Sequence, residues 1–276
     1  MHPAAEPFFL DSAHGQRFCL FHAPQGRCRG ALVYVHPFAE EMNKSRRMAA
    51  LQARALAEAG IGVLLIDLGG CGDSDGEFGH ARWAHWKLDL AAASAWLLER
   101  LERPVGLWGL RLGALLALDY AREASQPVAR LVLWQPVLKG SPFLTQFLRL
   151  RLAGALLDQS APQQGGTQAL RAALAAGQAL EVGGYLLSPD LAGAIDAATA
   201  DLAPPCPVHW FEMAATSDRP LTPATAALTA AWASQGRAPT MHQLSCPPFW
   251  ATQEIAECSA LVAATCAALE GQLHAA

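Results

Sequence analysis

Short apolar runs alternate along the first half of the chain with longer stretches in which apolar residues recur at helical spacing. The runs contain no regular polar positions, which is typical of strands buried inside a parallel sheet. They occupy residues 31–35, 61–67, 105–108 and 129–134. The helical patterns between them occupy residues 45–59, 83–102 and 112–124. With two short strands before them, at 8–11 and 17–22, they predict an α/β fold: a mostly parallel central sheet flanked by helices.

The alternation stops after the sixth strand. No strand pattern occurs between residues 139 and 203, and three helical segments follow one another at 143–157, 167–179 and 189–199. We interpret the block 139–203 as a helical lid inserted after the sixth strand, over the carboxyl edge of the sheet. Strands are then expected at 207–211 and 239–244, with a loop at 212–223 and a helix to residue 236 between them. A closing helix is expected at 252–269. A chain of 276 residues fits one domain spanning 1–276.

Composition narrows the class of protein. Apolar residues make up 52% of the chain and charged residues 16%, which indicates a globular protein. The net charge is −4 and no basic run occurs, which argues against nucleic acid as a partner. No run of 18 apolar residues occurs, so we expect no transmembrane segment, and the first 15 residues do not resemble a signal peptide.

The cysteines predict a reducing environment. Seven cysteines stand at irregular spacing with no Cys-x-x-Cys motif. This pattern favours reduced thiols in the cytoplasm over a disulfide framework or a zinc site. We therefore expect neither a metal ion nor another cofactor.

The most informative stretch runs from Gly109 to Gly113, with the sequence GLRLG. It joins an apolar strand to an apolar helix, as the Gly-x-Ser-x-Gly nucleophile elbow of the α/β hydrolases does. Arg111 stands where that motif has its serine. If the elbow is real, Arg111 has a strained left-handed backbone rather than helical dihedral angles.

Four further loops should meet Arg111, because ligands bind beyond the carboxyl ends of parallel strands. His36 and Phe38 occupy the place of the oxyanion loop, followed by Glu40 and Glu41. His36 is predicted either as a catalytic residue or as a buried turn residue. The glycine-rich loop at 68–76 contains Cys71 and Ser74, neither of which is a convincing substitute nucleophile.

The last two loops should carry an acid and a histidine. Asp218 stands at the position of the acid, with Glu212 as a second candidate and a turn residue as the alternative for Asp218. The final loop, 245–254, contains no histidine; Trp250 lies near its place. Two of the three triad residues are therefore absent. We predict catalytic roles for His36, Arg111 and Asp218, and ligand contacts from Phe38, Glu40, Glu41, Leu110, Leu112, Gln135, Glu212 and Trp250.

Arg111 has two competing interpretations. Its guanidinium group, at a helix N-terminus, suits a carboxylate or phosphate ligand. Alternatively, Glu212 and either Glu40 or Glu41 neutralise it within a structural ion pair that fills the old active site.

Four blocks of sequence together resemble one particular family. They are HPFAEEMNKSRR at 36–47, GLRLG at 109–113, LWQPV at 133–137 with QFLRLR at 146–151, and PFW at 248–250. They look like the second of two α/β-hydrolase-like proteins associated with the exosortase A system. The resemblance spans nearly the whole chain and implies an α/β-hydrolase fold in a Gram-negative bacterium, where PEP-CTERM proteins are exported and exopolysaccharide is made. It implies no substrate, and a triad does not transfer because Arg111 and Trp250 replace serine and histidine.

Three functions remain open from the sequence. The first is a hydrolase or acyltransferase acting on an ester or thioester with a degenerate triad. The second is a non-catalytic protein that binds an anionic or acylated small molecule, and the third is a pseudo-enzyme that binds proteins of the exosortase or exopolysaccharide system.

Overall fold

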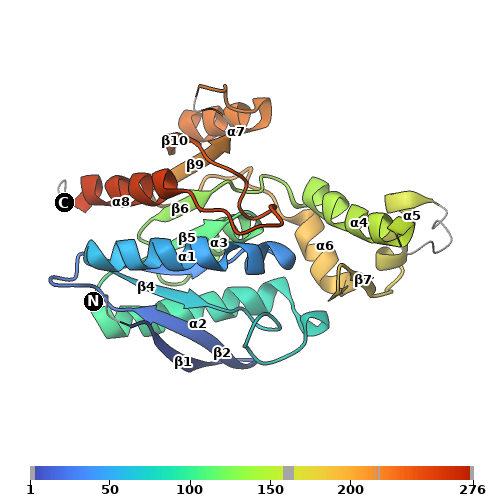
Figure 1. The fold of residues 1–276 in the computed structure, drawn as a ribbon, viewed down its shortest axis with the longest axis horizontal. Coiled ribbons are helices and arrows are strands. Elements are labelled where there is room, and N and C mark those ends of the chain that lie inside the picture. The colour runs from blue at the N-terminus through green and yellow to red at the C-terminus, as the bar shows by residue number, and fades with distance from the viewer. Residues whose placement is uncertain (1–3, 158–164, 215, 217, 274–276) are drawn as a thin grey trace.

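An eight-stranded sheet forms the centre of the molecule (Figure 1). The computed structural model describes residues 4–157, 165–214, 216 and 218–273. The strand order is β1-β2-β4-β3-β5-β6-β9-β10; β1 and β2 pair antiparallel, β2 pairs antiparallel with β4, and all other pairs are parallel. The bounds are β1 Glu6–Ser12, β2 Gly15–His22, β3 Gly30–Val35, β4 Ile61–Ile66, β5 Val105–Leu110, β6 Leu131–Trp134, β9 Val208–Ala214 and β10 Thr240–Ser245. The predicted mostly parallel sheet is confirmed.

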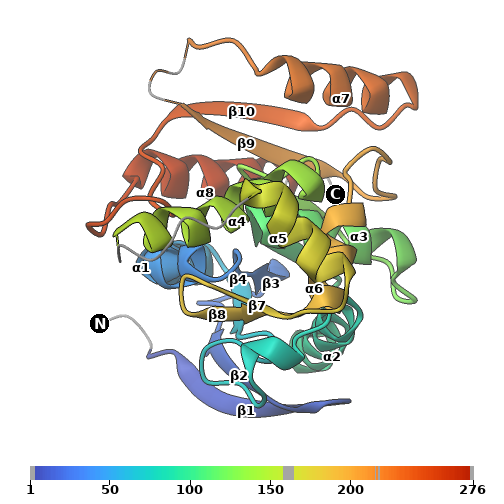
Figure 2. The same ribbon diagram turned by 90° about the vertical axis from the view of Figure 1, so that its right-hand side faces the viewer.

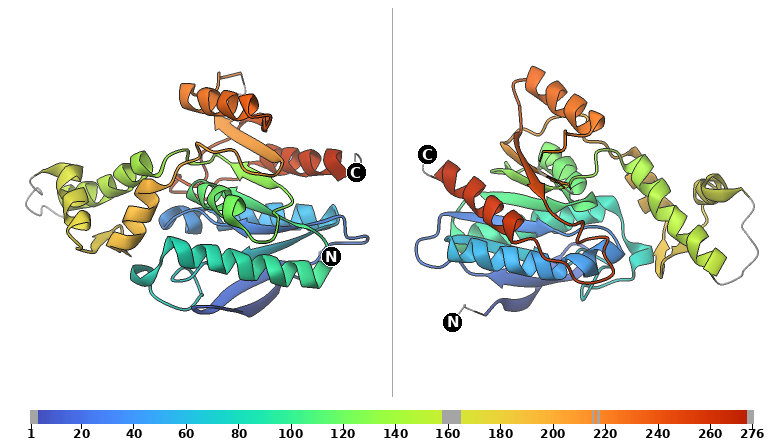
Figure 3. Two further views of the ribbon diagram at one scale, coloured as in Figure 1. Left: turned by 180° about the vertical axis from the view of Figure 1, so that it is seen from behind. Right: turned by 45° about the horizontal axis from the view of Figure 1, so that its top comes forward.

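Helices cover both faces of this sheet (Figures 1 and 3). Helices α2 (Trp83–Leu101) and α3 (Leu112–Glu123) pack on one face, and α1 (Glu40–Glu58) and α8 (Ser259–Leu273) pack on the other. A short 3-10 helix, η1 (Phe78–His80), precedes α2. Because β3, β5 and β6 are buried on both faces, their sequences are continuous apolar runs.

The starts of α1 and α8 differ most from those predicted. Helix α1 begins at Glu40 instead of residue 45, so Glu40 and Glu41 lie in its first turn. Carboxylates are favoured there because the helix dipole is positive at its N-terminus. Helix α8 begins at Ser259 rather than 252, which leaves a long loop after β10.

The block between β6 and β9 projects from the carboxyl edge of the sheet (Figure 1) and faces the viewer in Figure 2. It contains α4 (Gly140–Leu157), α5 (Gly166–Ala175) and α6 (Pro189–Ala197). It also contains a hairpin, β7 (Leu180–Val182) and β8 (Tyr185–Leu187), where no strand was expected. Three-residue strands are too short for an alternating pattern, so the expectation of an all-helical block was wrong here. The predicted loop at 163–166 lies partly outside the described residues.

Helix α7 (Pro223–Ser234) stands apart from the other helices, above β9 and β10 (Figures 1 and 2). Thr222 caps it by accepting a hydrogen bond from Thr225 N–H. Its main anchor is Trp232, which packs against Trp210 and donates its indole N–H to the Ala200 carbonyl, 3.1 Å away. In the described part of the chain, no helix is long and apolar enough to cross a membrane.

Candidate functional site

The elbow between β5 and α3 has the predicted strained geometry. Arg111 has φ 55° and ψ −119°, which is left-handed backbone and not helical. Close packing explains the two glycines of the motif: a Cβ on Gly113 would lie 2.3 Å from the Val35 carbonyl oxygen, and a Cβ on Gly109 would lie 2.5 Å from Ala114 Cα. Such a backbone costs on the order of 1–3 kcal/mol. The sequence GLRLG therefore folds as an elbow that presents arginine.

The Arg111 side chain is held between the first turn of α1 and the loop after β10. Its Nε lies 3.4 Å from Glu41 Oε1, at the start of α1. Its guanidinium carbon lies 5.4 Å from the centre of the Trp250 ring, in the loop after β10. This Nε bond is the one hydrogen bond that the guanidinium makes with the described residues, and 23% of the side chain is exposed. Four of its five N–H groups thus remain available to a ligand.

Glu41 is an unusual counter-ion. Burial raises the pKa of its carboxyl group to about 7, and Arg111 opposes that rise by attraction. Glu40, the next carboxylate along the helix, raises it further. Within the described chain, Oε2 of Glu40 and Oε2 of Glu41 are both buried without a hydrogen-bond partner. Near neutral pH, Glu41 therefore exists in both the protonated and the ionised form. Its electrostatic attraction to Arg111 weakens as the pH falls and the carboxylate gains a proton.

Backbone donors lie beside Arg111. Leu112 is the first residue of α3, so its N–H has no acceptor within the helix. Among the described residues, neither this N–H nor that of Phe38 makes a hydrogen bond. Pro37 has no N–H, and Ala39, with φ 52°, turns the chain into α1. These are the positions that form the oxyanion hole when an elbow carries a nucleophile.

His36 is buried and engaged at both ring nitrogens. Nδ1 donates to the Pro37 carbonyl at 2.8 Å, and Nε2 accepts from Leu68 N–H at 3.2 Å. Burial lowers the pKa of His36, so the imidazole is neutral. The ring therefore fastens the loop after β3 to the loop after β4. Both contacts agree with the interpretation of His36 as a buried turn residue. Its catalytic role stays a prediction, which no contact among the described residues supports.

Glu212 belongs to a separate hydrogen-bond cluster. It accepts bonds from Trp210 Nε1 at 2.9 Å, Thr225 Oγ1 at 3.1 Å and Gln135 Nε2 at 2.9 Å. Gln135 in turn accepts from Met213 N–H at 2.6 Å. The cluster joins β6, β9 and α7. The ion pair anticipated for Arg111 is therefore made by Glu41 and not by Glu212.

The side chains of three other predicted site residues are either exposed in a turn or buried in the core, although the backbone of Leu112 adjoins Arg111. Asp218 is exposed in the turn after β9, where no described contact joins it to Arg111. The side chain of Leu110 is completely buried in the core beneath α1 and α8, so it cannot form the predicted ligand contact. Leu112 is 2% exposed and packs against the opposite face of the sheet.

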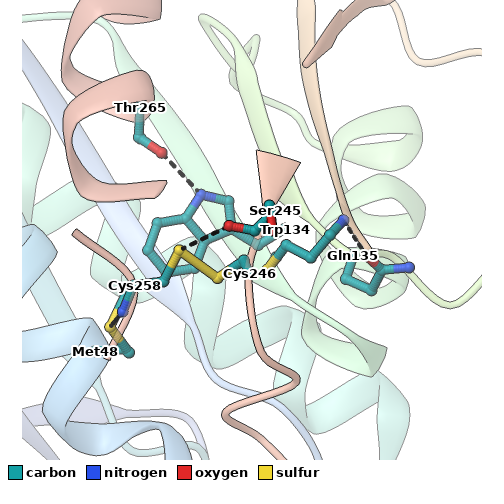
Figure 4. The surroundings of a disulfide bond; sticks show 8 residues. Met48, Trp134, Gln135, Ser245, Cys246, Cys258 and Thr265 are labelled. Carbon is teal, nitrogen blue, oxygen red and sulfur yellow. Dashed lines mark hydrogen bonds between the residues drawn. A yellow bond between two sulfur atoms is a disulfide. The ribbon is translucent and has the colours of Figure 1, made fainter. Parts of the chain in front are cut away.

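The loop that carries Trp250 is closed by a disulfide between Cys246 and Cys258 (Figure 4). This corrects the expectation of reduced thiols throughout, while Cys19, Cys28, Cys71, Cys206 and Cys266 are free. Cys258 N–H also donates to Met48 Sδ at 3.2 Å, which fastens the loop to α1. Cys71 is buried, and burial raises the pKa of its thiol, so it is a poor nucleophile. No cluster of metal-binding side chains occurs among the residues described.

Two cavities meet at Arg111. One has a volume of about 260 Å³ and is lined by Glu40, Glu41 and Trp250 among others. The other is a groove of about 740 Å³ between α4 and α7. Arg111, Phe143 and Gln146 line both. The helix that carries Phe143 and Gln146 is predicted by the sequence at 143–157, but the spacing of its residues does not show that it faces the elbow.

Comparison with known proteins agrees with this architecture. A family described as serine aminopeptidase, S33, matches residues 26–198, more than half of the chain. No curated protein matches by sequence. Among solved structures, Est1E from Butyrivibrio proteoclasticus with bound ferulic acid is 13% identical over 97% of this chain and 99% of its own, with a TM-score of 0.70.

Two further structures show the same fold. A soluble variant of monoglyceride lipase from Saccharomyces cerevisiae, in complex with a substrate analogue, is 14% identical over 98% of this chain and 96% of its own, with a TM-score of 0.63. The α/β hydrolase GrgF from Penicillium sp. sh18 is 17% identical over 99% and 100%, with a TM-score of 0.64. The sheet, the flanking helices and the elbow all agree with the family match, and the chain belongs to the serine aminopeptidase S33 family of α/β hydrolases.

Proposed function

We propose that this protein binds the anionic group of a small molecule at Arg111 and does not perform serine-type hydrolysis. The observation that carries the proposal is the placement of a guanidinium group at the elbow, where it makes one hydrogen bond to the described residues. A guanidinium group presents a planar fork of donors that matches carboxylate and phosphate oxygens. The N–H groups of Leu112 and Phe38 add donors for the same anion.

Glu41 acts in this proposal as a counter-ion that the ligand displaces. Its carboxylate compensates Arg111 when the site is empty and competes with an incoming anion. The pKa of about 7 means that one proton removes this competition in the neutral range. Anion affinity should therefore rise as the pH falls through 7.

A second candidate function is a hydrolase or acyltransferase that acts on an ester or thioester. The elbow backbone and the free N–H groups of Phe38 and Leu112 favour it, because they suit a developing oxyanion. Glu41 would then serve as general base, for which a pKa near neutrality is suitable. The resemblance stated above supports a place for either function in the exosortase and exopolysaccharide system, with the cytoplasm as the proposed location.

Calorimetric titration with sulfate tests the proposal, because sulfate keeps its charge across the neutral range. Wild-type protein should bind sulfate, Arg111→Ala should not, and Arg149→Ala, which removes an exposed arginine from α4, should bind as wild type does. Mass spectrometry of ligands that co-purify with wild type but not with Arg111→Ala would identify the natural anion. Equal sulfate binding by wild type and Arg111→Ala would show that the site is elsewhere.

A further inference from the structure

The groove between α4 and α7 is a large feature of the described structure that the anion site leaves unexplained. Its volume of about 740 Å³ lies within the usual range for small-molecule sites. Nine of its 13 lining residues are apolar, and the charged ones are Arg111, Lys139 and Asp201. Lys139 and Asp201 are exposed and of opposite sign, so Arg111 gives the groove its net positive charge.

One wall of the groove is a continuous apolar stripe on α7. Ala224, Ala227, Leu228 and Ala231 all line it, at the spacing i, i+3, i+4 and i+7. Such a stripe normally packs against a neighbouring element. Here the three alanines are exposed and Leu228 is half-buried. The buried anchor Trp232 lies at one flank of this stripe, so it does not cover the alanines. Small side chains leave space that a leucine-rich stripe would fill.

The opposite wall and the floor connect the groove to the elbow. Pro142 and Phe143 on α4 face the stripe, and the segment 136–139 forms the floor. Val137 N–H donates to the Arg111 carbonyl at 3.2 Å, so the floor begins directly at the anion site. A ligand can therefore place an anionic group on Arg111 while the remainder continues along apolar walls.

We infer that the groove between α4 and α7 holds the unbranched apolar chain of an amphiphile whose anionic head group binds Arg111. The inference rests on the anion site proposed above and assigns the ligand's chemical class. A flexible chain suits the groove better than a protein partner does, because the head group must reach a side chain that is only 23% exposed.

The test is a calorimetric series of n-alkanoates from acetate to dodecanoate, each below its critical micelle concentration. Each methylene that enters the groove should lower Kd about fourfold until the groove is full. Ala227→Trp and, independently, Ala231→Trp should abolish this chain-length dependence by occupying the space. Ala226→Trp places the same side chain on the neighbouring exposed residue, which does not line the groove, and should retain the wild-type series. Circular dichroism and thermal unfolding of each variant establish that it is folded.

The outcomes separate the two proposals. If acetate binds in an Arg111-dependent manner but every chain length binds alike, the groove inference is wrong and the anion site stands. If long chains bind wild type and Arg111→Ala equally well, the anion site is wrong. An unchanged chain-length dependence in both folded tryptophan variants would overturn the assignment of the chain to this groove.

Discussion

Replacing Glu41 with glutamine tests the electrostatics on which the anion site depends. Glutamine keeps the size of the side chain and removes its titration. In the folded protein the pKa of the Glu41 carboxyl group is about 7, against a usual value of 4.5. The difference of about 2.5 pH units corresponds to about 3 kcal/mol, at 1.36 kcal/mol per unit. Little of this is lost to solvent screening, because the side chain is 15% exposed.

The sign of the effect follows from which state holds the proton more tightly. Below pH 4.5 the carboxyl group is protonated in both states and contributes nothing to the pH dependence. Between pH 4.5 and about 7 the unfolded chain ionises first, so the free energy of unfolding of the wild type falls as pH rises. Above pH 7 the carboxyl group is ionised in both the folded and the unfolded state, so the loss in the free energy of unfolding stays constant at about 3 kcal/mol. Glu41→Gln should lack this loss.

Urea denaturation at a series of pH values measures the difference. The stability of Glu41→Gln relative to wild type should rise by about 3 kcal/mol between pH 4.5 and 7 and then level off. Glu99→Gln, which alters an exposed glutamate on α2, should follow the wild-type curve. Parallel curves for wild type and Glu41→Gln would refute the reasoning, because Glu41 would then ionise normally. A difference of opposite sign would show that attraction by Arg111 outweighs burial.

Three further predictions concern the elbow and its support. Gly113→Ala should destabilise the protein by about 3 kcal/mol or more in urea denaturation, because the new Cβ would lie 2.3 Å from the carbonyl oxygens of Val35 and His36. Unchanged stability would mean that α3 can move away from β3. Arg111→Gly should be more stable than Arg111→Ala by about 1 kcal/mol in the same assay, because glycine tolerates φ 55°; equal stability would argue against backbone strain. Glu212→Ala should cost about 3 kcal/mol, because three donors lose their acceptor, and Glu212→Gln should cost less than half as much by thermal unfolding. Equal losses would show that the cluster depends on charge rather than on hydrogen bonding.

The elbow shows how far local sequence can predict a site. The spacing Gly109-Leu-Arg-Leu-Gly113 after an apolar strand was sufficient to predict the left-handed backbone at Arg111, because only glycine tolerates the close approach of α3 to β5 and β3. The predicted counter-ions of Arg111 were Glu212 together with either Glu40 or Glu41, and the structure shows Glu41 in this role. Glu212 lies within β9 and does not follow the strand as expected, and its carboxylate accepts hydrogen bonds from Trp210, Thr225 and Gln135. Which donors surround a carboxylate depends on side chains that are distant in the sequence.

The sequence alone determined the order of buried strands, the position of the inserted block, the elbow and the absence of serine and histidine from their usual places. Hydrophobic periodicity and glycine spacing are local properties, so the chain reveals them without its fold. Only the tertiary structure decided that Glu41 and Trp250 hold Arg111, that both nitrogens of His36 are occupied, and that Cys246 pairs with Cys258. It also decided that α7 leaves an apolar stripe uncovered beside α4. These features depend on the distances between elements, which packing of the whole chain sets and no short stretch of residues encodes.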